Sequence, residues 1–164
     1  MKNIAIGLLM VVLLSVLVEP MVEIANVMRE KIVLGTALSN ACRAAKDRSL
    51  IYEKQRDRNA EIDQDMFKDY FAEAFESAMN VTRKPTTGSD LTFTSNDGKY
   101  NTFTVTLDIV SSTDPVTEQT VTQVNAKAES KYKFKTKYLK LAEGSESVGY
   151  DLTSERMLLL RVRN

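Results

Sequence analysis

Four carboxylates between residues 57 and 65 are the densest group of possible metal ligands in the sequence: Asp57, Glu61, Asp63 and Asp65. A calcium-binding loop needs oxygen ligands at alternating positions, a glycine at its sharp turn and a closing glutamate. Met66 and Phe67 follow Asp65 directly, where such a loop would continue, so the pattern predicts no metal site. We expect the cluster to be the solvated start of a helix, with Asp63 or Asp65 as its N-cap.

The chain lacks histidine, the residue type that acts most often as a general base. Its absence also removes the commonest metal ligand. The single cysteine, Cys42, lies among alanines on an apolar stripe, which favours a buried or interface residue over a nucleophile. We therefore predict neither enzymatic activity nor a bound cofactor.

Lysines alternate with aromatic residues in the segment KYKFKTKY, residues 131–138. On a strand, the four lysines would share one face and the aromatic rings the other. A basic stripe can bind phosphate backbones, but rings on the opposite face could not stack on a ligand held by the lysines. Lys plus Arg and Asp plus Glu both number 22, so no overall field attracts an acidic partner. We favour a strand with a solvated face over a nucleic-acid site.

Two carboxylates, Glu19 and Glu23, follow an uncharged apolar run from Ile4 to Val18. A carboxylate removed from water must be paired or neutralised. Lys2 precedes Glu19 by 17 residues, which is about 25 Å along a helix, so the two cannot pair within one straight helix. We hypothesise that these acids pair with the N-terminus of another copy and set the axial register of a filament. The alternative is that both lie exposed at a membrane surface and stabilise little.

The apolar run itself has three interpretations. Its length suits a cleaved secretory signal, with Lys2 as a minimal basic region, but Glu19 and Pro20 stand where small residues should precede a cleavage site. A membrane anchor needs about 20 residues, which extends the segment towards Met28, and Pro20 then predicts a kink or local unwinding. A pilin-type helix, which lies in the membrane before assembly and in a filament core afterwards, accommodates both the carboxylate and the proline.

The helical pattern continues beyond the apolar run to Ser49, because apolar or small residues recur at steps of three or four. The opposite face holds Arg29, Glu30, Lys31, Asn40, Arg43 and Lys46. We predict that the apolar stripe and the two acids form the contact surface between subunits. Its residues are Glu19, Glu23, Met28, Ile32, Gly35, Leu38, Cys42 and Ala45.

Residues 38–45 read Leu-Ser-Asn-Ala-Cys-Arg-Ala-Ala and follow an apolar helix with a glutamate-containing junction. In this combination residues 4–48 resemble the N-terminal region of TadE/TadF-like pilins and pseudopilins, type IV pilin-like proteins. The resemblance implies a filament subunit, or a minor subunit that primes or caps a filament, exported across the cytoplasmic membrane with the help of a pilus assembly machinery.

The rest of the chain predicts a second helix followed by strands. The helix from about Asp65 to Met79 should bury a stripe of apolar residues. The members of this stripe are Met66, Tyr70, Phe71, Ala74, Phe75, Ala78 and Met79. Helices followed by sequential strands favour an α+β fold, in which an antiparallel sheet carries helices on one face.

Four segments alternate as strands do. Leu91–Thr94 and Tyr100–Val110 flank an Asn-Asp-Gly turn at residues 96–98 and predict a β-hairpin. Val121–Leu141 predicts a long, bent strand, and Met157–Val162 predicts the last one.

We expect residues 1–50 to form a membrane or filament-core helix and residues 51–164 to form an α+β head. The function that fits this organisation is a homo-oligomeric structural subunit of a type IV or Tad-like surface pilus, which polymerises through its N-terminal helix. The alternative is a membrane-anchored assembly component or minor pilin-like protein that does not polymerise. In the first case the protein moves from the cytoplasmic membrane to an extracellular filament.

Overall fold

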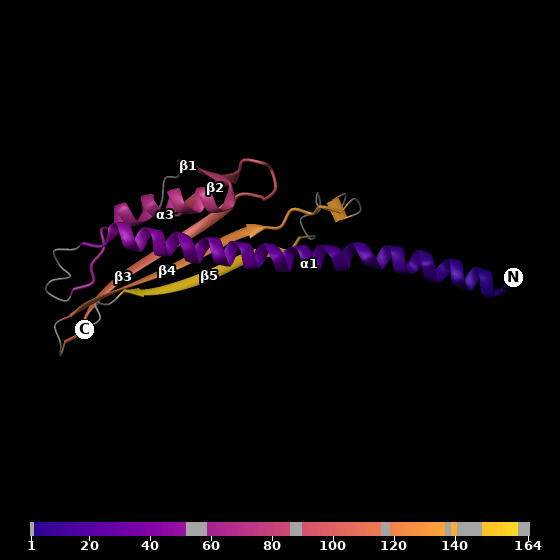
Figure 1. Cartoon of the computed structure of the whole chain (residues 1–164), viewed down its shortest axis with the longest axis horizontal. Helices are drawn as coiled ribbons and strands as arrows, with labels where there is room; N and C mark the ends of the chain where they lie inside the picture. The colour runs from indigo at the N-terminus through magenta and orange to yellow at the C-terminus, as the bar shows by residue number, and fades with distance from the viewer. Residues whose placement is uncertain are drawn as a thin grey trace.

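Helix α1 (Lys2–Ser49) runs the length of the molecule, and its N-terminal part projects alone from a head formed by the other elements (Figure 1). The computed structural model describes residues 2–51, 59–85, 90–115, 119–136, 139–140 and 149–160. The head contains α3 (Gln64–Met79) and the strands β1 (Val81–Lys84), β2 (Leu91–Ser95), β3 (Phe103–Thr113), β4 (Thr120–Lys131) and β5 (Asp151–Leu160). The predicted α+β class, with a long apolar helix, a second helix and an antiparallel sheet, is confirmed.

Pro20 lies inside α1 without interrupting it. A proline removes one backbone donor and therefore one hydrogen bond from the helical ladder. In a helix of 48 residues the turns on both sides remain bonded, and the local unwinding that we predicted at Pro20 is not observed.

The five strands form one antiparallel sheet in the order β1-β2-β3-β4-β5, so each strand pairs with its neighbour in sequence. The predicted hairpin is β2 paired with β3, and Gly98 in its turn adopts a positive φ of 67°. β1 was not predicted, because Val81 is the single buried residue in its four positions. The predicted strand from Val121 ends early, at Lys131, and the last strand begins earlier than predicted, at Asp151.

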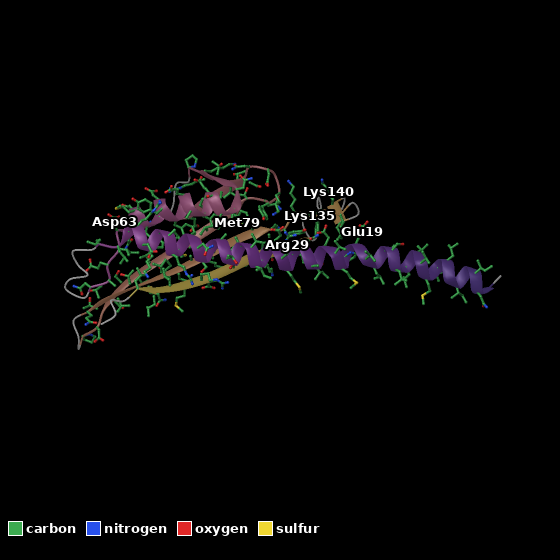
Figure 2. The ribbon with its side chains drawn as sticks, viewed as in Figure 1. Glu19, Arg29, Asp63, Met79, Lys135 and Lys140 are labelled. Atoms are coloured by element: carbon green, nitrogen blue, oxygen red, sulfur yellow. The ribbon has the colours of Figure 1, made fainter. Side chains whose placement is uncertain are left out.

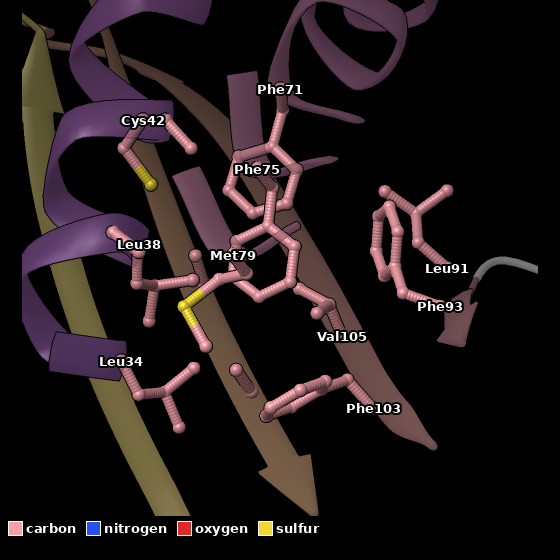
Figure 3. Close-up of a cluster of buried hydrophobic side chains, with 14 of the residues drawn as sticks. Leu34, Leu38, Cys42, Phe71, Phe75, Met79, Leu91, Phe93, Phe103 and Val105 are labelled. Carbon is pink, nitrogen blue, oxygen red and sulfur yellow. The ribbon is translucent and has the colours of Figure 1, made fainter. Parts of the chain in front are cut away.

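Both helices cover the same face of the sheet, and the hydrophobic core lies between them and the strands (Figure 3). The Phe75 ring lies 5.0 Å from the Phe93 ring and 6.0 Å from the Phe103 ring, measured between centroids. The core receives Leu34, Leu38 and Cys42 from α1, Phe71, Phe75 and Met79 from α3, and Phe93, Phe103 and Val105 from the sheet. The predicted boundary after residue 50 follows the end of α1, while the core contains side chains from both sides of it.

Both ends of α3 are capped, the first by the Asp63 side chain and the second by the backbone N–H of Asn80, which donates to the Glu76 carbonyl. The carboxylate of Asp63 accepts hydrogen bonds from the backbone N–H groups of Asp65 and Met66, each at 3.0 Å, which confirms the predicted N-cap. Asn80 ends the helix in the left-handed conformation, at a φ of 52°.

The buried face of α3 differs in part from the predicted stripe. Met66 is 43% exposed, and Ala78 is also exposed. Phe67, which was not in the predicted stripe, is fully buried and belongs to the hydrophobic core. The buried residues of α3 are Phe67, Phe71, Ala72, Phe75 and Met79.

These two neighbouring residues allow a direct test of the buried face. Phe67→Ala should lower the free energy of unfolding of the head by about 3–5 kcal/mol, because it leaves a cavity in the core. Met66→Ala should change it by less than about 1 kcal/mol, because the Met66 side chain is partly in water. Urea unfolding of both variants measures the difference, and a reversed order would contradict the orientation of α3.

Candidate functional site

The N-terminal part of α1 presents apolar side chains to its surroundings on every side. All side chains from residue 3 to residue 18 are exposed, and Ile4, Leu9 and Val11 are among the most exposed. By length and composition, α1 contains the one candidate membrane span among the described residues, and none of its most apolar window is buried in the molecule. A signal sequence near an N-terminus has the same length and apolarity. The exposed surface therefore supports contact with a membrane or with other chains, and by itself it does not distinguish an anchor from a signal.

Glu23 marks the point at which the head first closes over α1. Its side chain is fully buried, with 0% exposed. One carboxylate oxygen, Oε2, accepts a 2.8 Å hydrogen bond from the hydroxyl of Tyr132. The other, Oε1, accepts from the backbone N–H groups of Lys135 at 2.6 Å and Thr136 at 2.5 Å. Glu23 is therefore bound within its own chain, which corrects our assignment of this residue to a pair between subunits.

Glu30 repeats this arrangement two helical turns later. It is 3% exposed, and its Oε2 accepts a 2.6 Å hydrogen bond from the hydroxyl of Tyr100. The ammonium groups of Lys135 and Lys99 lie 3.1 and 3.3 Å from its Oε1. We predicted Glu30 on the polar face opposite the apolar stripe, but it is buried, because three polar groups from the head contact its carboxylate.

Glu23, Glu30, Tyr100, Tyr132 and Lys135 form what we call the junction network. The two glutamates lie seven residues apart, which places them on one face of α1. Burial raises the pKa of both tyrosines, and the hydrogen bonds to the carboxylates raise it further. The tyrosine hydroxyls therefore remain protonated donors at any physiological pH, and the network holds the chain after β4 against the helix.

The sequence analysis missed this network because it ranked the faces of α1 by apolarity. Two glutamates seven residues apart, together with a later segment rich in Tyr and Lys, were the available signal. The same segment lies directly after β4: the hydroxyl of Tyr132 donates to Glu23, and the buried ring of Phe134 packs against Tyr132 and Tyr150. Lys133 is partly exposed and Lys135 is exposed, so the predicted alternation persists there without a strand, while residues 137–138 lie outside the described residues.

Besides Glu23, four residues of the predicted subunit interface are buried inside this chain. Leu38, Cys42 and Ala45 are at most 2% exposed and belong to the core of the head. Gly35 lies beneath β5, where an added Cβ would come within 2.9 Å of the Arg156 guanidinium. Their assignment to an interface between subunits is corrected: their contacts are with elements of the same chain.

The geometry of a helix explains this error. A step of four residues turns a position by about +40° around the axis and a step of three by about −60°, since each residue turns it by about 100°. The predicted stripe uses both steps, so it drifts from the outer face at Met28 to the inner face at Ala45. Met28 and Ile32 are 63% and 71% exposed and lie on the side away from the buried stripe.

An outer stripe on α1 therefore continues the apolar surface of its N-terminal part. It consists of Met21, Ala25, Met28 and Ile32, all of them exposed and separated by steps of three or four residues. Met28 and Ile32 lie about 9 and 15 Å along the axis beyond Val22, at 1.5 Å per residue. The outer stripe thus runs alongside the head, past the level at which the junction network begins.

Glu19 lies between the apolar run and the junction network. It is partly buried and takes part in interactions with its surroundings. Figure 2 shows it on α1 at the end of the head from which the N-terminal part of the helix projects. Its pairing with another subunit stays a prediction.

The described residues contain no group of three or more His, Cys, Asp or Glu that could hold a metal ion. Asp63, the central member of the acidic cluster, is committed to capping α3, while Asp57 lies outside the described residues. Burial raises the pKa of the Cys42 thiol to about 12, so it is protonated at neutral pH. The chemistry that the site offers is therefore apolar contact along α1 and charged contact around the junction network.

Comparisons with protein-family models, with characterised proteins and with solved structures found no match to this chain. The architecture, a long N-terminal apolar helix that continues into a head with an antiparallel sheet, is generally pilin-like.

The junction network predicts a specific loss of stability when a hydroxyl is removed. Tyr132→Phe should lower the free energy of unfolding by about 1.5–3 kcal/mol, because Glu23 loses a charge-assisted hydrogen bond in a buried position. Tyr150→Phe is the matched control, since the Tyr150 side chain is 40% exposed. Urea unfolding without residues 1–22 measures both, and equal losses would show that the Tyr132 hydroxyl does not stabilise the junction.

The buried position of Cys42 predicts how slowly a thiol reagent labels it in the unassembled monomer. In a monomer lacking residues 1–22, a bulky thiol reagent should label Cys42 on the order of a thousandfold more slowly than in denaturant, because the thiol is buried and protonated. Rapid labelling of the folded monomer would contradict burial of Cys42 within its own chain and would support its predicted place at an interface between subunits.

Proposed function

We propose that this protein is a structural subunit of a type IV or Tad-like surface pilus that polymerises through α1. One observation carries the proposal: the outer stripe extends alongside the head, beyond the part of the helix that a membrane would cover. Met28 and Ile32 keep 63% and 71% of their surface exposed there, although large apolar side chains are stabilised by burial. Copies of the same chain, packed helix to helix, bury the whole stripe.

The same helix fits a membrane before assembly. The stretch from Ile4 to Val22 measures about 28 Å at 1.5 Å per residue, close to the roughly 30 Å of a bilayer's hydrocarbon core. The junction network begins at Glu23, directly after this stretch. A subunit inserted over residues 4–22 would leave the head outside the bilayer, and release into a filament would exchange lipid for neighbouring helices.

The assignment to TadE/TadF-like proteins rests on residues 4–48 and belongs to this proposal. Under it, the protein is held in the cytoplasmic membrane, is recruited by a pilus assembly machinery and ends in an extracellular filament. The head then faces outward, with both helices on the side of the sheet that adjoins the filament core.

The second candidate is a membrane-anchored assembly component that does not polymerise. The match between residues 4–22 and the bilayer favours it equally, because an anchor needs the same length. The two candidates differ at the outer stripe, which an anchor does not need to bury. A test that leaves residues 4–22 intact therefore separates them.

Met28→Glu combined with Ile32→Glu should abolish filaments while membrane insertion stays normal, because two charges on the outer stripe cannot be buried between helices without partners. Filament yield is measured by electron microscopy of sheared material, and insertion by resistance to alkaline extraction. The matched control is Met157→Glu with Leu159→Glu on β5, which changes two apolar residues of similar exposure, 69% and 53%, on the sheet.

Filaments from the helix variant but not from the sheet variant would contradict polymerisation through α1. A wild-type chain that inserts and forms no filament when produced with its assembly machinery would favour the anchored component.

A further inference from the structure

The chain that follows β4 brings lysines to the level at which α1 leaves the head. The backbone N–H groups of Lys135 and Thr136 bind Glu23, and the backbone N–H of Lys140 donates to the Thr136 carbonyl at 3.0 Å. Figure 2 shows Lys135 and Lys140 near Glu19 and Arg29, at the end of the head that faces the projecting helix. We call Lys133, Lys135 and Lys140 the basic collar.

Lysines of the collar are exposed, whereas two of the three glutamates of α1, Glu23 and Glu30, turn inward, and the third, Glu19, is partly buried. Lys140 is exposed, and the Lys135 side chain keeps 42% of its surface exposed even though its ammonium contacts Glu30. Glu23 and Glu30 are buried at 0% and 3%, and Glu23 is satisfied by a hydroxyl and two backbone N–H groups. A negatively charged surface that approaches this end of the head therefore meets exposed ammonium groups, beside one partly buried carboxylate, Glu19.

We infer that the basic collar binds the headgroups of anionic phospholipids while α1 is in the membrane. The projecting part of α1 ends near Val22, because Glu23, the next residue, is buried and is held by the backbone of the collar. If residues 4–22 occupy the hydrocarbon core, the collar lies at headgroup level on the side of the head. Its ammonium groups, on flexible stems, reach lipid phosphates there. A nucleic-acid ligand is disfavoured, because the rings of Tyr132 and Phe134 are buried and cannot stack on bases.

The size of the effect follows from the charge of the surface. Each lysine at headgroup level raises the association constant for an anionic lipid by roughly fivefold. This factor corresponds to about 1 kcal/mol, at 1.4 kcal/mol per tenfold change. This preference must weaken in salt, because the Debye length falls to about 3 Å at 1 M. The inference rests on the membrane stage of the proposed function and does not depend on polymerisation.

The test uses the full-length chain reconstituted in phosphatidylcholine bilayers. Electron spin resonance with trace amounts of chain-labelled phosphatidylglycerol or phosphatidylcholine measures which lipid associates with the protein. We expect phosphatidylglycerol to be preferred several-fold at low salt and the preference to disappear at 1 M salt. Lys133→Gln with Lys140→Gln should reduce the preference strongly, and it leaves Lys135 bound to Glu30.

The matched control is Lys68→Gln with Lys84→Gln, which removes the same charge from α3 and β1 and should leave the preference unchanged. An inserted wild-type chain without a preference, or equal losses in both variants, would overturn the inference. Either result leaves the filament proposal untouched, which the outer-stripe variants test separately. A chain that resists insertion would overturn the collar inference together with the membrane stage.

Discussion

The burial of two carboxylates on α1 decides where the head begins. A buried carboxylate is costly unless strong donors replace its hydration, and Glu23 and Glu30 find these donors in two tyrosine hydroxyls, two backbone N–H groups and two lysines. If the chain after β4 moved away, these carboxylates would lose most of their hydrogen bonds. The network thus fastens the head to the helix from Glu23 onward, while residues 3–18 stay exposed.

This attachment gives α1 two faces with different partners. The inner face, from Val27 to Ala45, packs on α3 and the sheet and belongs to the core of the head. The outer stripe, with Met28 and Ile32, receives no such cover. The first face is needed to fold one chain, and under the proposed function the second contacts a membrane or other copies. A helix that serves both purposes must be apolar over more of its circumference than a helix of a monomeric protein.

Sequence patterns predicted the elements that local chemistry specifies. The length of α1, the Asp63 cap and the hairpin around Gly98 were predicted because helix periodicity, capping and turn residues act over short distances. The contacts that join distant segments were not predicted. Glu30 was placed on the polar face opposite the apolar stripe, since its partners Tyr100 and Lys135 lie 70 and 105 residues away. Likewise, Cys42 was placed between subunits, because an apolar pattern does not distinguish contact with the same chain from contact with another copy.

The pairing of Glu23 within its own chain also changes what sets the register of an assembly. Apolar contact between outer stripes is non-directional, so helices alone would slide along one another at little cost. The head cannot slide on its helix, because the junction network binds it at Glu23 and Glu30. Each head is therefore held at a fixed axial position on its own helix. When helices pack side by side, the heads would then meet at one axial offset. In the proposed filament, Glu23 and Glu30 would contribute to the register from inside each subunit, by holding the head in place, while a pair between Glu19 and another subunit stays a prediction.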